Sequence, residues 1–394
     1  MSSANQVRVV AIPETTYGQT PGVGNFKTSR FTSESLSGTP ETTESQQIRT
    51  DRQSSGQVVT GLTVGGDINS ELAKEDIIDD FIEGAMYSVW DAKAPVAVDL
   101  TIATGAGTIT RGAGDWNTDV EVGDVLTLTA FADSNNNTEV MVTEIQSATV
   151  IRFSGPTSMV DEVGAGTSYQ IADEIEIGTT KKSFSIEKSF LDLTTKAINY
   201  RGMIAANMSF NVAYGEIVTT TFTFQGNGYE AVDQAANFMT DGRTIDAAAT
   251  TNSLNGSVDM PFLVNSADGT LDTSDFCIQS VELSLNNNLT AQTCIGQAAP
   301  DDYSEGTAQI EISLTAYLAN ENWQLLASKL TQAPFELGFI VKNAGGFYGF
   351  FIPAVQVSFE DPAAGGINQD VFLNMTGTAK IGANGEKALK MFRS

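Results

Sequence analysis

The sequence repeats one pattern of side chains, once near its N-terminus and once in its C-terminal third. In residues 61–72 and again in residues 307–318, apolar and polar residues alternate, and a helix-like segment follows each stretch. The apolar positions match at a constant offset of 246 residues: Leu62, Val64, Ile68 and Leu72 correspond to Ala308, Ile310, Leu314 and Leu318. An internal repeat of this kind predicts two copies of one folding unit, and a symmetric assembly would then hold twice as many units as subunits.

Each copy is predicted to form a strand, a helix and then three further strands. Alternation predicts the strands, and a period of three to four residues predicts the helices. In the first copy these elements are 58–72, a helix over about 74–86, 184–190, 203–212 and 218–224. In the second copy they are 308–318, a helix over 320–330 with Trp323, Leu326 and Leu330 facing inward, 335–341, 350–359 and 371–375. The pattern aligns Phe222 and Phe224 with Leu373 and Met375.

These elements predict a mainly β fold with short helices. It consists of two duplicated modules of the sandwich or half-barrel type, each with one helix, and an inserted small β domain whose alternating strands predict a barrel or sandwich. Ser33–Ser55 is predicted to be an extended arm or long loop. The expected organisation is the arm and first part of module 1 (1–90), the inserted domain (91–180), the second part of module 1 (181–228), a linker (229–272), module 2 (273–382) and a C-terminal tail (383–394).

Composition argues against several classes of function. With 48 acidic and 21 basic residues the formal net charge is −27, so tight binding to a phosphate backbone is disfavoured. The chain has no histidine, which removes His-dependent catalytic triads and imidazole metal ligands. Cys277 and Cys294 form no metal-binding pattern, and we expect two reduced, packed thiols or at most one disulfide. Met1–Pro13 lacks a secretory pattern and no apolar stretch could span a membrane, so we expect synthesis in the cytoplasm.

Two acidic segments are candidates for chemistry. Asp133–Glu144 has oxygen-bearing side chains at spacings that echo a calcium loop, but Thr138 stands where the sharp turn needs glycine, so an Asn-rich hairpin turn is favoured. A second run lies in the first predicted helix and is predicted to form a solvated or subunit-facing surface: Glu75, Asp76, Asp79, Asp80 and Glu83. We therefore predict no catalytic, cofactor-binding or metal site, no cofactor, and a function other than catalysis.

The predicted strands have one polar side that carries no Lys or Arg. Its charged residues are Asp67, Glu71 and Glu311. A solvent-facing sheet surface in an acidic protein is one interpretation, and a shared, enclosed environment is the other. The residues on this side are Thr63, Asp67, Asn69, Glu71, Asn207, Ser209, Asn211, Thr219, Thr221, Thr223, Gln309, Glu311, Ser313, Gln356, Ser358, Asn374 and Thr376.

Several stretches carry a family resemblance. They are Ala11–Pro21, Thr43–Gln53, Val64–Leu72 with the acidic helix after it, Phe184–Phe190, Tyr200–Met203, and, in the insertion, Gly107–Thr110 with Val122–Asp124. In these stretches the chain resembles the major tail (tail tube) proteins of long, non-contractile-tailed bacteriophages. The resemblance implies rings in which each unit lends strands to a continuous inner β-barrel, with arms that join one ring to the next.

Combined with the repeat, the resemblance predicts a homotrimeric ring of six units, with a homohexamer as the alternative. The polar side would face the lumen, through which double-stranded DNA passes without specific binding. The expected partners are further copies of the chain and the tape measure, tail terminator and distal tail proteins, in the virion tail and away from any membrane. Other interpretations that stay open are the tube of a contractile or secretion-type machine and a β-rich surface-binding module.

Ring stacking is assigned to Ser33–Ser55 and to its counterpart Asn286–Gly306. We expect the charged cluster of Arg49, Asp51 and Arg52 to form a salt bridge between subunits, although an ordinary solvated loop would have the same composition. The predicted stacking residues are Gly38, Glu41, Glu44, Arg49, Asp51 and Arg52.

Overall fold

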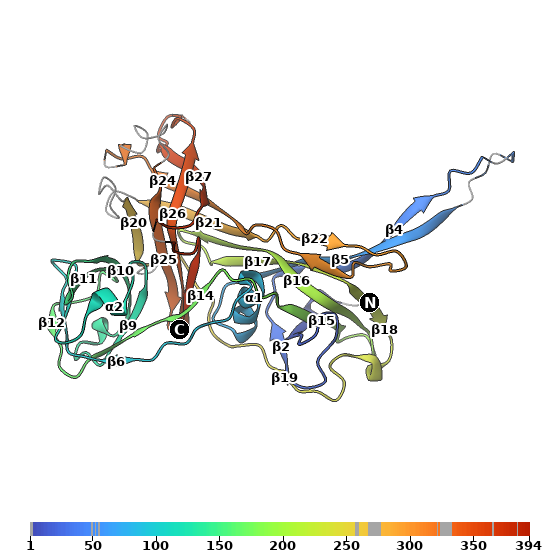
Figure 1. Cartoon of the computed structure of the whole chain (residues 1–394), viewed down its shortest axis with the longest axis horizontal. Coiled ribbons are helices and arrows are strands. Elements are labelled where there is room, and N and C mark those ends of the chain that lie inside the picture. Colours follow the sequence, from blue (N-terminus) through green and yellow to red (C-terminus); the bar gives the residue numbers. More distant parts are fainter. Residues whose placement is uncertain are drawn as a thin grey trace.

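The computed structural model describes residues 3–48, 50, 51, 53, 56–256, 260–266, 277–320, 322, 323, 333–364, 366–383 and 385–394. Within these residues the strands form one sheet of 18 strands, one of eight and a two-stranded ribbon, accompanied by two α-helices. The molecule is elongated: a hairpin arm projects at one end of the long axis, and the eight-stranded sheet lies at the other (Figure 1). The predicted mainly β fold class is confirmed.

The two copies of the repeat have the same strand order. All neighbours are antiparallel. Module 1 has the order β5 (Gln57–Glu71), β17 (Thr219–Gly226), β16 (Ala197–Ala213) and β15 (Ser183–Phe190), and module 2 has the order β24 (Gln309–Tyr317), β27 (Phe372–Ala379), β26 (Gly346–Phe359) and β25 (Phe335–Asn343). The duplication predicted from the sequence is therefore present in the fold.

The strand register corrects one alignment between the copies. Ile68 pairs with Phe222, and its counterpart Leu314 pairs with Met375. Phe222 therefore corresponds to Met375, and its predicted match to Leu373 was wrong by two residues. Alternating strands are nearly invariant to a shift of two, so the sequence pattern alone cannot detect such a slip.

Shorter strands extend both modules. In module 1, β1 (Val7–Pro13) pairs with β15 and β2 (Phe26–Ser29), β18 (Gly228–Val232) pairs with β16, and β19 (Ile245–Asp246) pairs with β2. In module 2, β20 (Phe262–Ser266) pairs with β25, and β28 (Lys390–Arg393) pairs with β26 and with β14 (Asp173–Glu176). Residues 229–272, for which we predicted a linker, thus contribute β18, β19 and β20. Short 3-10 turns lie at Ala4–Gln6, Ser134–Asn136 and Ala235–Asn237.

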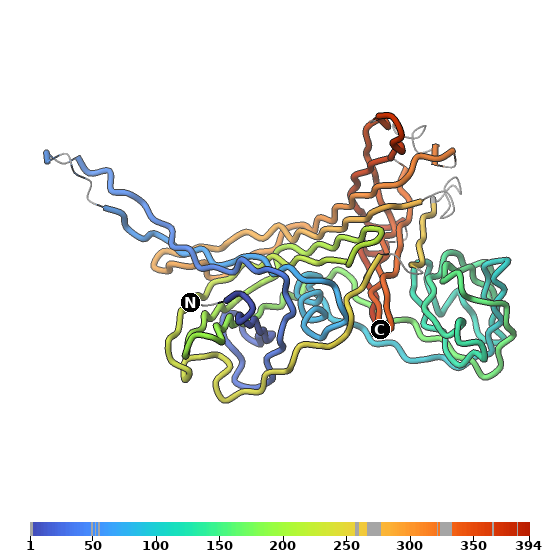
Figure 2. Tube along the Cα trace, turned by 180° about the vertical axis from the view of Figure 1, so that it is seen from behind, coloured from blue at the N-terminus to red at the C-terminus, as the bar shows by residue number. Residues whose placement is uncertain are grey.

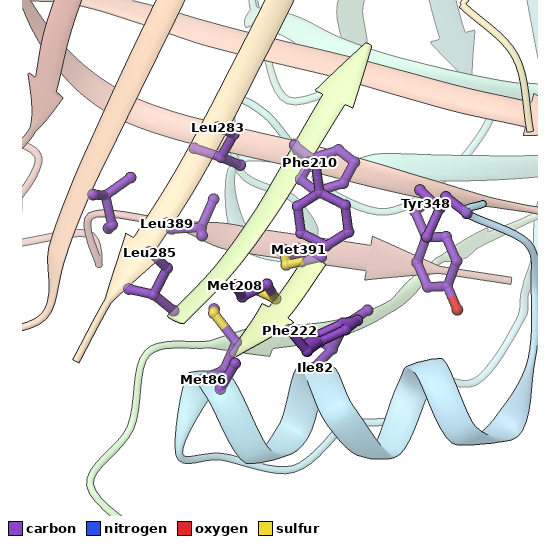
Figure 3. Packing of buried hydrophobic residues seen from close by; sticks show 14 of the residues in the cluster. Ile82, Met86, Met208, Phe210, Phe222, Leu283, Leu285, Tyr348, Leu389 and Met391 are labelled. Atoms are coloured by element: carbon purple, nitrogen blue, oxygen red, sulfur yellow. The ribbon is translucent and has the colours of Figure 1, made fainter. Parts of the chain in front are cut away.

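Helix α1 (Asp76–Met86) packs against the apolar side of the module 1 sheet. Its Phe81 ring lies 5.3 Å from the ring of Phe184 and 5.0 Å from that of Phe224, measured between centroids. Figure 3 shows Ile82 and Met86 of the same helix facing Phe222 and Met208. The helix ends at Tyr87, whose left-handed conformation (φ 52°) stops the backbone hydrogen-bond pattern.

Most of the second predicted helix, 320–330, lies outside the described residues, including Leu326 and Leu330. Trp323 is described, and its side chain is 58% exposed. The prediction that Trp323 faces inward was therefore wrong.

The acidic run of α1 was predicted to form a solvated or subunit-facing surface, and the structure contradicts the solvated alternative. Glu75 and Asp79 are buried, and only Asp76 of the run is exposed. Ion pairs join Arg30 to Glu75, Lys27 and Lys182 to Asp80, and Lys182 to Glu83. Asp79 is bound from module 2 by Arg393 (2.9 Å) and by the hydroxyl of Tyr348 (2.7 Å). Because these partners are remote in sequence, helix periodicity could not reveal them.

The inserted segment forms a small closed barrel around its own core, which includes Trp116 and Tyr169. Its strand order is β12–β7–β8–β11–β10–β9–β13–β6. Because β6 and β7 are two parts of one extended stretch, and β6 pairs with β13 while β7 pairs with β8, the sheet closes on itself. The elements are β6 (Val96–Ala97), β7 (Leu100–Ala103), β8 (Thr108–Arg111), α2 (Trp116–Asp119), β9 (Val125–Thr129), β10 (Glu139–Ile145), β11 (Val150–Ser154), β12 (Glu162–Val163) and β13 (Ser168–Ile171).

The barrel is inserted into module 1 but packs on module 2. Val125 and Met141 of the barrel share an apolar cluster with Phe347, Phe351 and Phe392. Beside this cluster, the ammonium of Lys390 lies among four carboxylates at 3.2 to 3.6 Å, those of Glu121, Asp124, Glu174 and Glu176. Asp124 is almost fully buried, and its Oδ1 lacks a hydrogen-bond partner.

This site predicts a pH-dependent stability. Burial raises the pKa of Asp124 to about 6, although Lys390 opposes the shift. The folded state therefore holds a proton that the unfolded state releases between about pH 4 and pH 6, and this group's contribution to stability falls as the pH rises through that window. Asp124→Asn, which mimics the protonated acid, should match wild-type stability near pH 4 and exceed it at pH 7 by about 2 to 3 kcal/mol.

The measurement is the thermal unfolding midpoint of both proteins from pH 4 to pH 8. A variant that is less stable than wild type at pH 7 would contradict the prediction, because the Lys390 pair would then outweigh the cost of burying the charge.

Candidate functional site: a polar sheet face shared by both modules

One strand joins the two modules into a single sheet. β21 (Ile278–Asn286) pairs with β16 of module 1 on one side and with β24 of module 2 on the other. In Figure 2 its orange trace runs beside the green strands of module 1. The sequence analysis predicted no strand here, although Val281, Leu283 and Leu285 alternate with Glu282 and Ser284 and give the signal of one.

At the other edge of module 1, β3 (Ser33–Glu34) and β4 (Ser37–Glu44) pair with β5. Ser33–Ser55 was predicted as an extended arm or long loop, and its first twelve residues are mostly strand. The spatial order is therefore β26–β27–β24–β21–β16–β17–β5–β3/β4, with four strands from each module.

A single row of paired residues crosses all eight strand positions. Ser33 pairs with Asn69, Asn69 with Thr221, and Thr221 with Ser209. Ser209 pairs with Ser284, which joins the modules. Ser284 then pairs with Glu311, Glu311 with Thr378, and Thr378 with Gln356. Residues directly opposite one another in such pairs lie on the same side of a sheet, so the polar side is continuous from one edge to the other.

All 17 residues predicted for the polar side lie on it, and none is buried. They alternate with buried residues such as Ile68, Phe222 and Ile312, which point to the core. The sequence analysis missed further members of this side, namely Ser33, Ser35, Ser37, Thr39, Glu282, Ser284, Asn286, Thr315 and Thr378.

The polar side is neutral to acidic. Its carboxylates are those of Glu41, Asp67, Glu71, Glu282 and Glu311. With β16 counted from Asn207 to Ala213, where it pairs with β21, these strands carry no Lys or Arg on this side; Lys380 follows directly after β27. The hydroxyl of Thr223 donates to Asp67 at 2.7 Å. Gln309 donates to Glu311 at 2.8 Å. Neutral donors therefore hold the carboxylates of Asp67 and Glu311. A shallow groove lies between Glu282, Glu311 and Gln356.

The predicted stacking residues that the structure describes lie in the β4–β5 hairpin and its tip. We call residues 40–61 arm 1. Gly38 lies at its base, where a Cβ would meet the ring of Tyr229 at 2.4 Å. Glu41 accepts a 2.6 Å hydrogen bond from Thr63 across the hairpin. Glu44 ends β4, and Asp51 follows in the tip. Arg49 and Arg52 lie outside the described residues, as does the predicted cluster that depends on them.

The predicted counterpart is Asn286–Gly306; because Asn286 is the last residue of β21, we call residues 287–307 arm 2. It contains the ribbon of β22 (Thr290–Gln292) and β23 (Asp302–Ser304). This arm is packed against module 1: the N–H of Leu62 donates to Ala298 at 2.7 Å, and the hydroxyl of Tyr303 donates to Gly226 at 3.0 Å. Cys294, near its tip, and Cys277 are both free and exposed, so the prediction of packed thiols was wrong.

Polar groups of the candidate calcium loop form hydrogen bonds with one another and with a neighbouring strand. Asp133 accepts from the N–H of Asn135 at 2.9 Å, and Glu162 accepts from Asn136 at 2.7 Å. Across the part of the chain that the structure describes, no group of three or more His, Cys, Asp or Glu side chains could hold a metal ion. No described helix is long and apolar enough to cross a membrane.

A continuous polar sheet face built by two modules, with arms at corresponding positions, defines a β-rich protein made of two fused copies of one module. Comparison with protein families gives the more specific class: the family model for phage tail tube proteins matches residues 4–379. The chain belongs to the phage tail tube protein family, and the resemblance seen in the sequence is confirmed at this level. It is a structural component of the virion tail that assembles with itself and with other tail proteins into a tube. A search of curated proteins finds no match to the chain.

Proposed function

We propose that three copies of this chain form a ring whose lumen is lined by the polar side of the eight-strand sheet, and that stacked rings carry double-stranded DNA. The observation that carries the proposal is the unbroken row from Ser33 to Gln356, which gives one chain a two-module, lysine- and arginine-free face. A sheet with exposed edges is prone to pair with another chain, and ring closure removes such edges.

Strand arithmetic supports three copies. Eight strand positions per chain give 24 in a trimer. With a strand spacing of about 4.8 Å and a tilt of about 40°, the backbone of such a barrel is roughly 45–50 Å across. After side chains fill part of this width, a DNA duplex still fits. Six copies would give a barrel of about twice that diameter, which far exceeds what one duplex needs.

The charge of the face supports passage without binding. Affinity for DNA comes largely from Lys and Arg that replace condensed counterions, and the five carboxylates on this face have the opposite sign. DNA would therefore slide along hydroxyl, amide and carboxylate groups. The tape measure, tail terminator and distal tail proteins are the proposed partners inside and at the ends of the tube.

The test is electron microscopy of the purified protein combined with a mass measurement of released rings. We expect hollow filaments or open rings, with three chains per ring. Six chains per ring would refute the trimer, and a monomer without any ring or filament would refute the proposed function.

A further inference from the structure

Strand pairing joins the two modules within one chain, and we call this contact the internal junction. At this internal junction β21 of module 2 pairs with the second half of β16, from Asn207 opposite Asn286 to Ala213 opposite Ser280. The adjoining Asn287 is buried; its backbone N–H donates to Ala206 at 2.9 Å, and its side chain donates to Ala205 at 3.1 Å. Arm 2 then crosses onto module 1.

Both halves of this junction have counterparts at the two ends of the same sheet. Glu34 pairs with Ile68 as Val281 pairs with Leu314, so β3/β4 is the module 1 counterpart of β21. Ser358 pairs with Thr376 as Asn207 pairs with Thr223, so the end of β26 is the counterpart of the second half of β16. One chain thus carries both partners of a second, identical type of junction, at opposite edges where they cannot meet each other.

The β26 edge differs from its counterpart in a way that fits a missing neighbour. β15 leaves β16 at Ile204, and β21 takes its place. β25 likewise leaves β26 at Val355, but within the described residues no strand takes its place beside Val357 and Ser358. β16 continues to Ala213, whereas β26 ends at Phe359.

The two arms are also counterparts. Thr43 pairs with Val58 in arm 1 as Thr290 pairs with Ser304 in arm 2. Arm 2 packs on module 1, where the hydroxyl of Tyr303 donates to the carbonyl of Gly226. Arm 1 projects from the body (Figures 1 and 2), and its Val58 and Val59 are each 62% exposed. The position equivalent to Gly226 in module 2 is Ala379, and Ile381 beside it is 67% exposed.

Building on the proposed ring, we propose that the junction between copies repeats the internal one. The β3/β4 edge and arm 1 of one copy bind the β26 edge and module 2 of a second copy, with Thr39 opposite Ser358 of the partner subunit. The occupant of these edges is another molecule of this chain, because the same chain already provides the matching surface. Repetition of one head-to-tail junction generates a ring when the rotation per copy divides a full turn, and three copies require a rotation of about 120°.

Local chemistry limits the length of the new ladder. At the internal junction the backbone N–H of Tyr214 donates to the carbonyl of Gln279. The backbone N–H and C=O groups of the even-numbered residues of β16 therefore point toward β21. Pro362 corresponds to the odd-numbered Asn211, so its missing N–H falls on the β27 side. Pro40 corresponds to Asn287 and cannot donate as that residue does. At Leu36 the carbonyl already accepts from Tyr200 (2.8 Å), so the ladder between copies is interrupted there.

Disulfide trapping tests this junction. In a background with Cys277→Ser and Cys294→Ser, the variant Thr39→Cys with Ser358→Cys places two thiols at a non-hydrogen-bonded antiparallel pair. Such pairs have Cα atoms about 4.5 Å apart, within the range that a disulfide spans. We expect mild oxidation to link most chains to another chain. A denaturing gel should then show covalent dimers and trimers but no larger species. The matched control is Asn207→Cys with Asn286→Cys, which should form a bond within one chain.

Each outcome decides one point. Linked species larger than a trimer would overturn a ring of three copies. If Thr39→Cys with Gln356→Cys links chains as efficiently as Thr39→Cys with Ser358→Cys, the proposed register is overturned. If rings are visible and the control bond forms but Thr39→Cys and Ser358→Cys stay unlinked, the junction is wrong and the proposed ring stands. If the control bond forms but neither rings nor linked chains are found, the ring itself is refuted.

Discussion

Phage assembled with Thr221→Lys and Asn374→Lys in this protein are expected to have tails of normal length but an infectivity at least about 100-fold lower than wild type. The two positions are equivalent in modules 1 and 2, because Asn69 pairs with Thr221 as Thr315 pairs with Asn374. Their side chains are on the polar face, with neutral neighbours such as Ser209. In the proposed trimer each ring would gain six cations at one level of the lumen.

The physical reason is the cumulative attraction between lysines and DNA. Neutralising six to ten phosphates already changes a binding constant by about 10³ to 10⁵ between 50 and 200 mM salt. A stack of rings offers many times that number of contacts, so DNA should be retained in the tube. Ring assembly should be preserved, because both side chains lie on the surface side of the sheet and outside the core.

Plaque titre divided by genome-containing particles measures the infectivity, and filter binding of duplex DNA to purified tubes at low salt measures the attraction. Thr221→Gln with Asn374→Gln is the matched control, since it adds length without charge and should behave as wild type. Normal infectivity of the lysine variant, in tubes that assemble, would mean that this face does not line the DNA path.

The sequence was sufficient to place 17 residues on the polar face, even though it misaligned the two copies and missed other members. Side chains on a strand alternate with a period of two. The two-residue error that matched Phe222 to Leu373 therefore moved each residue along its strand and kept it on the same side. The helix of module 1 was predicted for a related reason: the spacing of Ile77, Ile78, Phe81 and Ile82 depends only on local geometry.

What the sequence analysis missed depends on contacts between remote segments. β21 has a clear alternation, but its counterpart around Leu36 and Gly38 is irregular, so comparing the copies hid it. The ion pairs of Asp79 and Glu75 bring cations from residues 30 and 393 to one helix. No local pattern indicates that a carboxylate will meet such a partner, which is why a solvated surface was one of the two interpretations of the acidic run.

Aspartate at Ile48 and Ile295 is expected to stop assembly at single rings. The two isoleucines belong to arms 1 and 2 and are fully exposed. They occupy equivalent positions, since both follow the paired threonines, Thr43 and Thr290, by five residues. A fully exposed isoleucine at the same place in both arms suggests contact with another molecule, and the adjacent ring is the one we propose.

Burial of one isoleucine stabilises an interface by about 1.5 to 3 kcal/mol. Six such residues per proposed ring would therefore contribute on the order of 10 kcal/mol, and aspartate would remove this contribution and add the cost of desolvating a charge. Electron microscopy should show rings without tubes, and sedimentation should show one species of ring size. Two separate controls should form normal tubes. They are Ile48→Leu with Ile295→Leu, which keeps both side chains apolar, and Val23→Asp, at a residue 83% exposed outside both arms. Tubes of normal length from the double aspartate variant would exclude the arm tips from ring stacking, whereas loss of the rings themselves would place these residues in the junction between copies.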